Sequence, residues 1–146
     1  MYVKDHMTKK PVTVTPDTSV STVLDIMQKG HFHRVPVVDE NGVLKGLITE
    51  GVVTEASGQN TTSLSIFELN YLLSRTSVED IMIKNVKTVT EDQFVEQAAQ
   101  VMLDAGINVL PVVDEANKVI GIITEKDIFK TFVDLLGLKH QGTKFV

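Results

Sequence analysis

Two residues near the end of the chain have types and a spacing that suit the binding of a phosphate-bearing ligand. Thr124 and Asp127 are three residues apart, in the segment TEKD, where a helix is predicted to begin. A hydroxyl and a carboxylate at this spacing face the same way in the first turn, and a helix N-terminus offers phosphate free N–H groups and a favourable dipole. The same pair also fits a capping box, in which Thr caps the helix and the acid reaches back to its start. Both interpretations stay open.

This motif belongs to the second of two copies of one unit. Residues 3–53 align without a gap with residues 78–128, and 19 of the 51 aligned positions are identical. Thr49 corresponds to Thr124, but Val52 stands where the second copy has Asp127. A valine side chain accepts no hydrogen bond, so only the second copy is predicted to bind nucleotide here. Two copies favour a pseudo-twofold pair over a solenoid, which needs three or more units.

Each copy is predicted to contain the same succession of elements. A short extended piece precedes an amphipathic helix, whose apolar residues recur at positions 20, 23, 24 and 27 and at 95, 98, 99 and 102. The runs Val35–Val38 and Leu110–Val113 predict strands buried on both faces. Each return strand contains a glycine, Gly46 or Gly121, which marks a bulge or a close backbone approach. A second helix closes each copy, so the pattern indicates a mixed α/β fold.

Composition excludes several classes of function. The chain has 146 residues, a net charge of −5 and no cysteine, and 42% of its residues are hydrophobic. The negative charge argues against non-specific binding of nucleic acid, and the lack of cysteine excludes disulfides and thiolate chemistry. No apolar run is long enough for a membrane span, and the N-terminus does not read as a signal peptide. We expect a cytoplasmic protein that contacts neither nucleic acid nor membrane.

The sequence offers no catalytic constellation. We find no paired nucleophile and base and no glycine-rich phosphate loop, so we expect no enzyme activity. His31 and His33 would share one face if both lay on a strand, but no third metal ligand is near them in sequence. We therefore expect no bound metal.

The motifs PVVD and G-x-x-T, which occur in both copies, give the chain a family resemblance. Each copy resembles the CBS domain, and the tandem resembles a CBS domain pair, also called a Bateman module. The linker and the chain end are most similar to the acetoin-utilisation type of bacterial CBS protein. The resemblance implies two β-α-β-β-α repeats, each with a small three-stranded sheet, packed about a pseudo-twofold axis with two clefts between them. It also implies a homodimer, and an unknown downstream protein or C-terminal domain that reads the signal.

The resemblance further implies an adenosine ligand, of which AMP, ADP or ATP is our first hypothesis. S-adenosylmethionine and cyclic di-AMP are alternatives, and a dimerisation scaffold without ligand is another. Family motifs would place Thr124 and Asp127 on the ribose and phosphate. The remaining candidate contacts are the residues around each proline and on the preceding extended pieces: Thr13, Val14, His33, Arg34, Val35, Thr88, Val89, Asn108, Val109, Leu110 and Pro111. For most of these Val and Leu residues, a place in the core is the better interpretation.

We divide the chain into a first repeat at 1–57, a linker at 58–77, a second repeat at 78–136 and a tail at 137–146. The linker is predicted to begin as a polar loop and to continue as a helix that docks on the core or on another subunit. The tail has two interpretations, a loose terminus or the start of a missing ACT domain.

Overall fold

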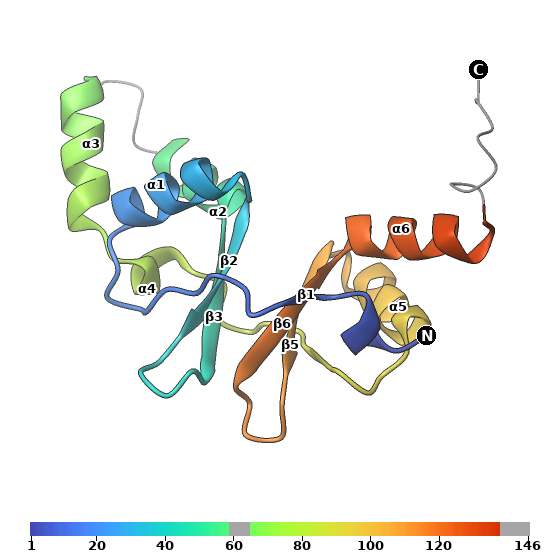
Figure 1. The fold of residues 1–146 in the computed structure, drawn as a ribbon. Coiled ribbons are helices and arrows are strands. Elements are labelled where there is room, and N and C mark those ends of the chain that lie inside the picture. Colours follow the sequence, from blue (N-terminus) through green and yellow to red (C-terminus); the bar gives the residue numbers. More distant parts are fainter. Residues whose placement is uncertain (59–64, 138–146) are drawn as a thin grey trace, which may run out of the picture. The chain divides into compact units, whose positions relative to one another are not determined.

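The computed structural model describes residues 1–58 and 65–137, so the predicted polar loop and nearly all of the predicted tail lie outside the described residues. The chain forms two compact units. The β2–β3 unit comprises Pro11–Val86 and Glu115–Val119, and the β5–β6 unit comprises Met1–Lys10, Lys87–Asp114 and Ile120–Val146. Helices and small sheets alternate in both, which confirms the mixed α/β class (Figure 1).

The β5–β6 unit contains a four-stranded sheet with the strand order β1-β6-β5-β4. Its elements are η1 (Val3–Asp5), β1 (Thr8–Lys9), β4 (Val89–Thr90), α5 (Val95–Ala105), β5 (Val109–Val113), β6 (Val119–Thr124) and α6 (Glu125–Leu135). Every residue of β5 is buried, as its unbroken apolar run predicted. The fourth strand, β1, pairs with β6 at the edge of the expected three-stranded sheet.

The β2–β3 unit is built on a two-stranded antiparallel sheet. Its elements are α1 (Val20–Gly30), β2 (Arg34–Val38), β3 (Leu44–Thr49), α2 (Glu50–Gly58), α3 (Ile66–Arg75) and α4 (Val78–Ile81). The expected third strand is reduced to one parallel bridge between Val14 and Val37. Pro11 and Pro16 bracket this extended piece, and proline has no N–H to give to a ladder.

The short segments that open the two repeats are exchanged between the units. Val3, which opens the first repeat, is fully buried in the core built from the second repeat, beside Leu110 and Ile123. Val78, which opens the second repeat, is fully buried in the core built from the first, beside Val35. The two repeats read from the sequence therefore differ from the two compact units at these segments.

The exchange explains the glycine in each return strand. A Cβ added at Gly46 would lie 2.7 Å from the carbonyl oxygen of Ile83 and 2.7 Å from Met82 Sδ. A Cβ added at Gly121 would lie 2.5 Å from Met7 Sδ. Both glycines thus mark a close approach by an exchanged segment, which confirms the prediction from sequence. The β2–β3 ladder also shifts register between Val37 and Val38, opposite Gly46.

The first helix of each repeat ends in a residue of left-handed conformation. In α5 this residue is Gly106. In α1 it is His31, with φ 56°, directly after the last helical residue, Gly30. Gly30 has a different role, because a Cβ there would lie 1.9 Å from a ring carbon of Phe32. His31 consequently lies outside strand β2, and the alternation of a strand does not relate it to His33.

The linker helix docks on its own unit, one of the two expected arrangements. Helix α3 is capped by Ser65, whose hydroxyl accepts the N–H of Glu68, and it packs against α1. Its half-buried residues are Leu69 and Leu73, and none is fully buried. Two other apolar residues of the helix, Ile66 and Leu72, are exposed. The contact between α3 and α1 therefore uses a narrow strip of the helix.

Candidate functional site

The start of α6 brings Thr124 and Asp127 together. Strand β6 delivers Thr124 to the N-cap, where its hydroxyl accepts the N–H of Asp127 at 3.4 Å. Asp127 Oδ2 in return accepts the N–H of Thr124 at 2.9 Å and its hydroxyl at 3.2 Å. This is a complete capping box, so the structural interpretation of the pair is confirmed. Both side chains are half-buried, and a carboxylate and a hydroxyl therefore meet at a helix N-terminus.

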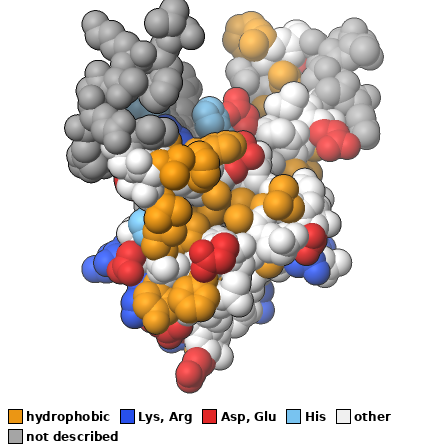
Figure 2. All heavy atoms as spheres, turned by 90° about the vertical axis from the view of Figure 1, so that its right-hand side faces the viewer, with side chains coloured by type: hydrophobic (Ala, Val, Ile, Leu, Met, Phe, Trp, Pro, Cys, Tyr) orange, Lys and Arg blue, Asp and Glu red, His pale blue; other side chains and the backbone are white. Residues whose placement is uncertain are grey.

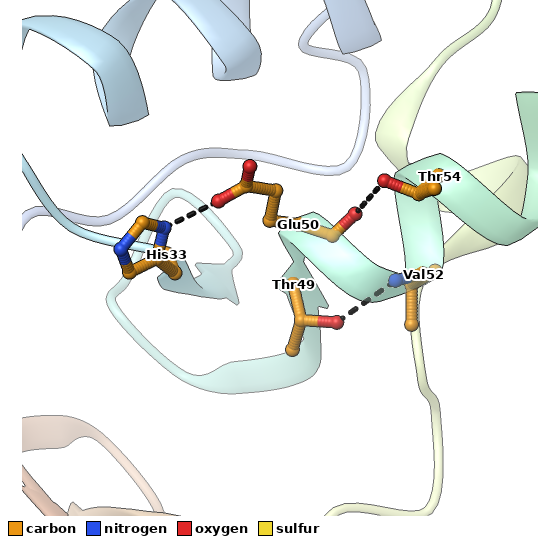
Figure 3. A network of polar contacts seen from close by, with 5 residues as sticks. All are labelled: His33, Thr49, Glu50, Val52 and Thr54. Atoms are coloured by element: carbon orange, nitrogen blue, oxygen red, sulfur yellow. Dashed lines mark hydrogen bonds and ion pairs between the residues drawn. The ribbon is translucent and has the colours of Figure 1, made fainter.

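The start of α2 has a different chemistry, although a threonine hydroxyl also accepts a backbone N–H there. The Thr49 hydroxyl accepts the N–H of Val52 at 3.1 Å, but Val52 returns no hydrogen bond (Figure 3). Instead, Glu50 turns toward His33, and its Oε2 contacts the ring Nδ1 of that histidine (Figure 3). The first turn of α6 thus carries two acidic residues, Glu125 and Asp127, whereas the first turn of α2 carries Glu50 alone.

A backbone hydrogen bond ties each helix start to the residues before the buried strand. The N–H of Glu125 donates to the carbonyl of Asn108 at 3.0 Å. The N–H of Glu50 donates to the carbonyl of His33 at 2.9 Å. Asn108 is therefore a neighbour of the α6 capping box, and His33 is a neighbour of the α2 start, within their respective units.

The other candidate residues divide into core and surface. Six apolar candidates are buried: Val14, Val35, Val89, Val109, Leu110 and Pro111. Val35 and Leu110 have no exposed surface, so their side chains serve the cores. Thr13 and His33 are exposed, and Arg34, Thr88 and Asn108 are half-buried. These polar residues, with Thr124 and Asp127, are the candidates whose side chains reach the surface.

Glu50 is the functional candidate that the sequence interpretation missed. It faces a cavity of about 410 Å³ in the β2–β3 unit, together with Leu24, Met27, Gln28, His31, Phe32 and His33. The available signal was the tripeptide Ile-Thr-Glu, identical in both copies, which places a glutamate directly after each Thr. The second repeat has Asn108 in place of His33, so the contact between an imidazole and a carboxylate belongs to the first repeat alone.

Asp39 has the one resolved shift of pKa among the described residues. The backbone N–H of Val43 donates to the Asp39 carboxylate and lowers the pKa of that carboxyl below 3.8. Desolvation acts in the opposite direction, whereas the N–H of Asn41 and the positive charge of Lys45 lower the pKa further. The aspartate therefore fastens the hairpin between β2 and β3, as the turn sequence Asp39–Gly42 leads one to expect.

The described residues contain neither a cluster of potential metal ligands nor a helix that could span a membrane. Within residues 1–58 and 65–137, no three His, Asp or Glu side chains gather as metal ligands. Over the same ranges, every helix is too short or too polar to cross a bilayer.

Comparison with protein families finds two matches along the chain. The model of the CBS domain family matches residues 3–57 and 78–134. The L-aspartate semialdehyde sulfurtransferase of Methanocaldococcus jannaschii is 34% identical over 130 residues, which cover 89% of this chain and 23% of the enzyme. A CBS domain-containing protein of Dictyostelium discoideum is 30% identical over 136 residues, which cover 93% of this chain and 94% of the relative. The chain thus spans about a quarter of the length of the first of these relatives.

Solved structures share the fold over nearly the whole chain. The CBS domain pair of protein MJ0100, in complex with 5′-methylthioadenosine and S-adenosyl-L-methionine, has a TM-score of 0.79 and 32% identity, and the match covers 92% of this chain and 98% of that one. CBSX2, from Arabidopsis thaliana and solved in complex with AMP, has a TM-score of 0.76 and 29% identity, with the same coverage. AcuB from Vibrio cholerae, at 24% identity and a TM-score of 0.78 over 99% of this chain, shares the fold.

Proposed function

Because the chain belongs to the CBS domain family as a tandem pair, we propose that it is a regulatory module that senses AMP, ADP or ATP at the start of α6. The observation that carries the proposal is the hydroxyl and carboxylate of Thr124 and Asp127, held together at 3.2 Å at a helix N-terminus. A carboxylate accepts two ribose hydroxyls, and the helix N-terminus favours a phosphate. The CBS domain pair of CBSX2, which covers nearly the same length, was solved with AMP and supports this ligand class. The module itself has no catalytic role in this proposal.

The two repeats are proposed to differ in ligand binding. Val52 occupies the position of Asp127 and offers no acceptor for a ribose hydroxyl. The neighbouring Glu50 already contacts His33. We therefore assign the nucleotide to the β5–β6 unit and expect one nucleotide per chain.

The capping box would couple ligand binding to the conformation at the start of α6. Asp127 Oδ2 holds the first turn of α6, so a ligand that recruits this carboxylate changes the hydrogen bonds at the helix start. The helix carries Phe129, Phe132 and Leu135, each more than half exposed. Figure 2 shows hydrophobic side chains gathered on the face of the molecule on the α5–α6 side. We propose that this apolar face packs against a second copy of the chain, and that the ligand adjusts this contact.

S-adenosylmethionine is the second candidate ligand. The pair of protein MJ0100 is more similar in sequence than CBSX2, at 32% against 29% identity, and it was solved with S-adenosyl-L-methionine. Both candidates share the adenosine moiety, so the same residues of this chain would serve either one. The substituent on the ribose distinguishes them, because S-adenosylmethionine carries a sulfonium and an amino acid in place of phosphate.

Thermal unfolding with AMP, ADP, ATP, S-adenosylmethionine and cyclic di-AMP tests the proposal. A ligand at 100 times its Kd stabilises the folded chain by about 2.7 kcal/mol, which raises Tm by roughly 5–10 °C for a chain of this size. The matched variants are Asp127→Ala, which should abolish the shift, and Val52→Ala, which should leave it unchanged. Because Asp127→Ala also removes a cap, the quantity compared is the ligand-induced shift and not Tm itself. Failure of every ligand to shift Tm would favour a scaffold without ligand.

A further inference from the structure

Helix α3 exposes a stripe of four residues that the nucleotide proposal does not use. Glu68, Tyr71, Leu72 and Arg75 are spaced i, i+3, i+4 and i+7, so they lie along one face of the helix. All four are exposed, and the neighbouring Phe67 is 81% exposed. The contact with α1 uses the other side, where Leu69 and Leu73 are half-buried. An apolar centre of this kind is open to solvent in the isolated chain.

The charges of this stripe are self-complementary. Glu68 and Arg75 are the charged residues of α3, and they stand at opposite ends of the stripe with Tyr71 and Leu72 between them. A twofold axis that passes between Tyr71 and Leu72 would bring Glu68 of one copy opposite Arg75 of another, twice. A parallel arrangement would instead place like charges together. The guanidinium of Arg75 lies 5.9 Å from the centre of the Tyr71 ring, and Tyr71 remains 66% exposed.

The length of the helix gives a second reason for a partner. Helix α3 has ten residues, fewer than the roughly 12–15 below which an isolated helix is marginal in water, so it depends on packing such as its narrow contact with α1. A packed neighbour on the exposed face would hide Phe67 and Tyr71 from water, and this burial stabilises a helix more than its intrinsic propensity does.

We propose that α3 is a self-association element, in which the stripe Glu68–Tyr71–Leu72–Arg75 packs antiparallel against the same stripe of a second copy. Pairing of helix faces in an isologous contact makes each interaction occur twice. The contact is small beside the ~1,200–2,000 Å² of a stable interface, so it joins the copies weakly and adds to any other contact between them. It is separate from the apolar face of α6 and does not depend on nucleotide.

Disulfide trapping tests this contact, because the chain has no cysteine of its own. Leu72→Cys places a thiol beside the proposed axis, and Ser74→Cys places one on the flank of the same helix as the matched control. Under mild oxidation, the Leu72→Cys chain should form the covalent dimer at least about ten times faster than the Ser74→Cys chain. Equal rates for the two variants would overturn the proposal.

Charge reversal then tests the antiparallel pairing. In the Leu72→Cys chain, Glu68→Arg or Arg75→Glu alone should slow the trapping about fivefold, because like charges would meet at both ends. The double reversal should restore the original rate. Glu55→Arg, at an exposed position on α2, is the control for net charge and should leave the rate unchanged. Single reversals without effect, or a double reversal that does not restore trapping, would contradict the antiparallel stripe.

Discussion

The two return-strand glycines should respond unequally to the same substitution. Gly46→Ala would put a methyl group 2.7 Å from the backbone oxygen of Ile83 and 2.7 Å from Met82 Sδ. At Gly121 the nearest atoms are Met7 Sδ at 2.5 Å and Cε at 3.1 Å, and the backbone oxygen of Thr8 is 3.1 Å away. A methionine side chain can rotate away from the added methyl group. The carbonyl oxygen of Ile83 accepts the N–H of Leu47 at 2.9 Å, so it cannot move without disturbing that bridge.

These contacts set the expected magnitudes. Overpacking costs about 1–3 kcal/mol, and the loss of unfolded-state freedom from Gly to Ala returns about 0.4–1 kcal/mol. Gly46→Ala should therefore lower the free energy of unfolding by about 1–2 kcal/mol. Gly121→Ala should change it by less than about 0.5 kcal/mol, because the side chain of Met7 gives way.

Urea unfolding followed by circular dichroism measures this difference as a shift in midpoint at constant slope. Gly51→Ala is the matched control, since its Cβ would meet only Thr49 Oγ1, at 3.9 Å, and it lies in the first turn of α2. That control should stabilise the chain by about 0.5 kcal/mol, since alanine is the better helix former. If Gly121→Ala lowers the free energy of unfolding as much as Gly46→Ala does, then the Met7 side chain does not move aside more easily than the Ile83 carbonyl, and the reasoning is wrong.

Substitutions at three further positions have defined outcomes. His31→Gly should raise the free energy of unfolding by about 0.5–1 kcal/mol, because φ 56° strains a residue with a Cβ. Thermal unfolding would show this change as a higher Tm. An unchanged Tm would mean that the cap carries no strain. Thr124→Ala should cost about 1 kcal/mol by removing the N-cap hydroxyl of α6, whereas Thr124→Ser should keep most of it in the same assay. Because the pKa of Asp39 is lowered in the folded chain, its carboxylate stabilises the fold above pH 3.8, and this stabilisation is lost as pH falls through the folded-state pKa. Asp39→Asn should therefore lose less stability than the wild type on acidification, in unfolding curves below pH 4. An identical loss would contradict the hairpin role of Asp39.

Local patterns in the sequence determined most of the secondary structure. The apolar spacing at positions 20, 23 and 27 gave a helix with those residues buried, and the unbroken run at Val109–Val113 gave a buried strand. Gly46 and Gly121 predicted a close approach to each return strand, although the sequence did not identify the residues that make it. Helices, strands and close approaches of this kind depend on residues near one another along the chain. The two copies of the repeat therefore predict the same succession of elements.

The candidate site could be predicted in part. Thr124 and Asp127 meet as their spacing required, because the first turn of a helix fixes both side chains. The contact of Glu50 with His33 was not visible, since it joins residues 17 positions apart through the pairing of β2 with β3. The same pairing placed the side chain of Val35 in the core.

Tertiary structure alone decided which core receives each opening segment. Val3 and Val78 occupy equivalent positions of the repeat and are identical, so these two residues do not by themselves select a core. The folded chain places Val3 with the second repeat and Val78 with the first, and it turns Gly46 and Gly121 into contacts with Met82 and Met7. The physical reason is that a duplicated sequence specifies equivalent docking surfaces, and only the path of the connecting chain selects between them.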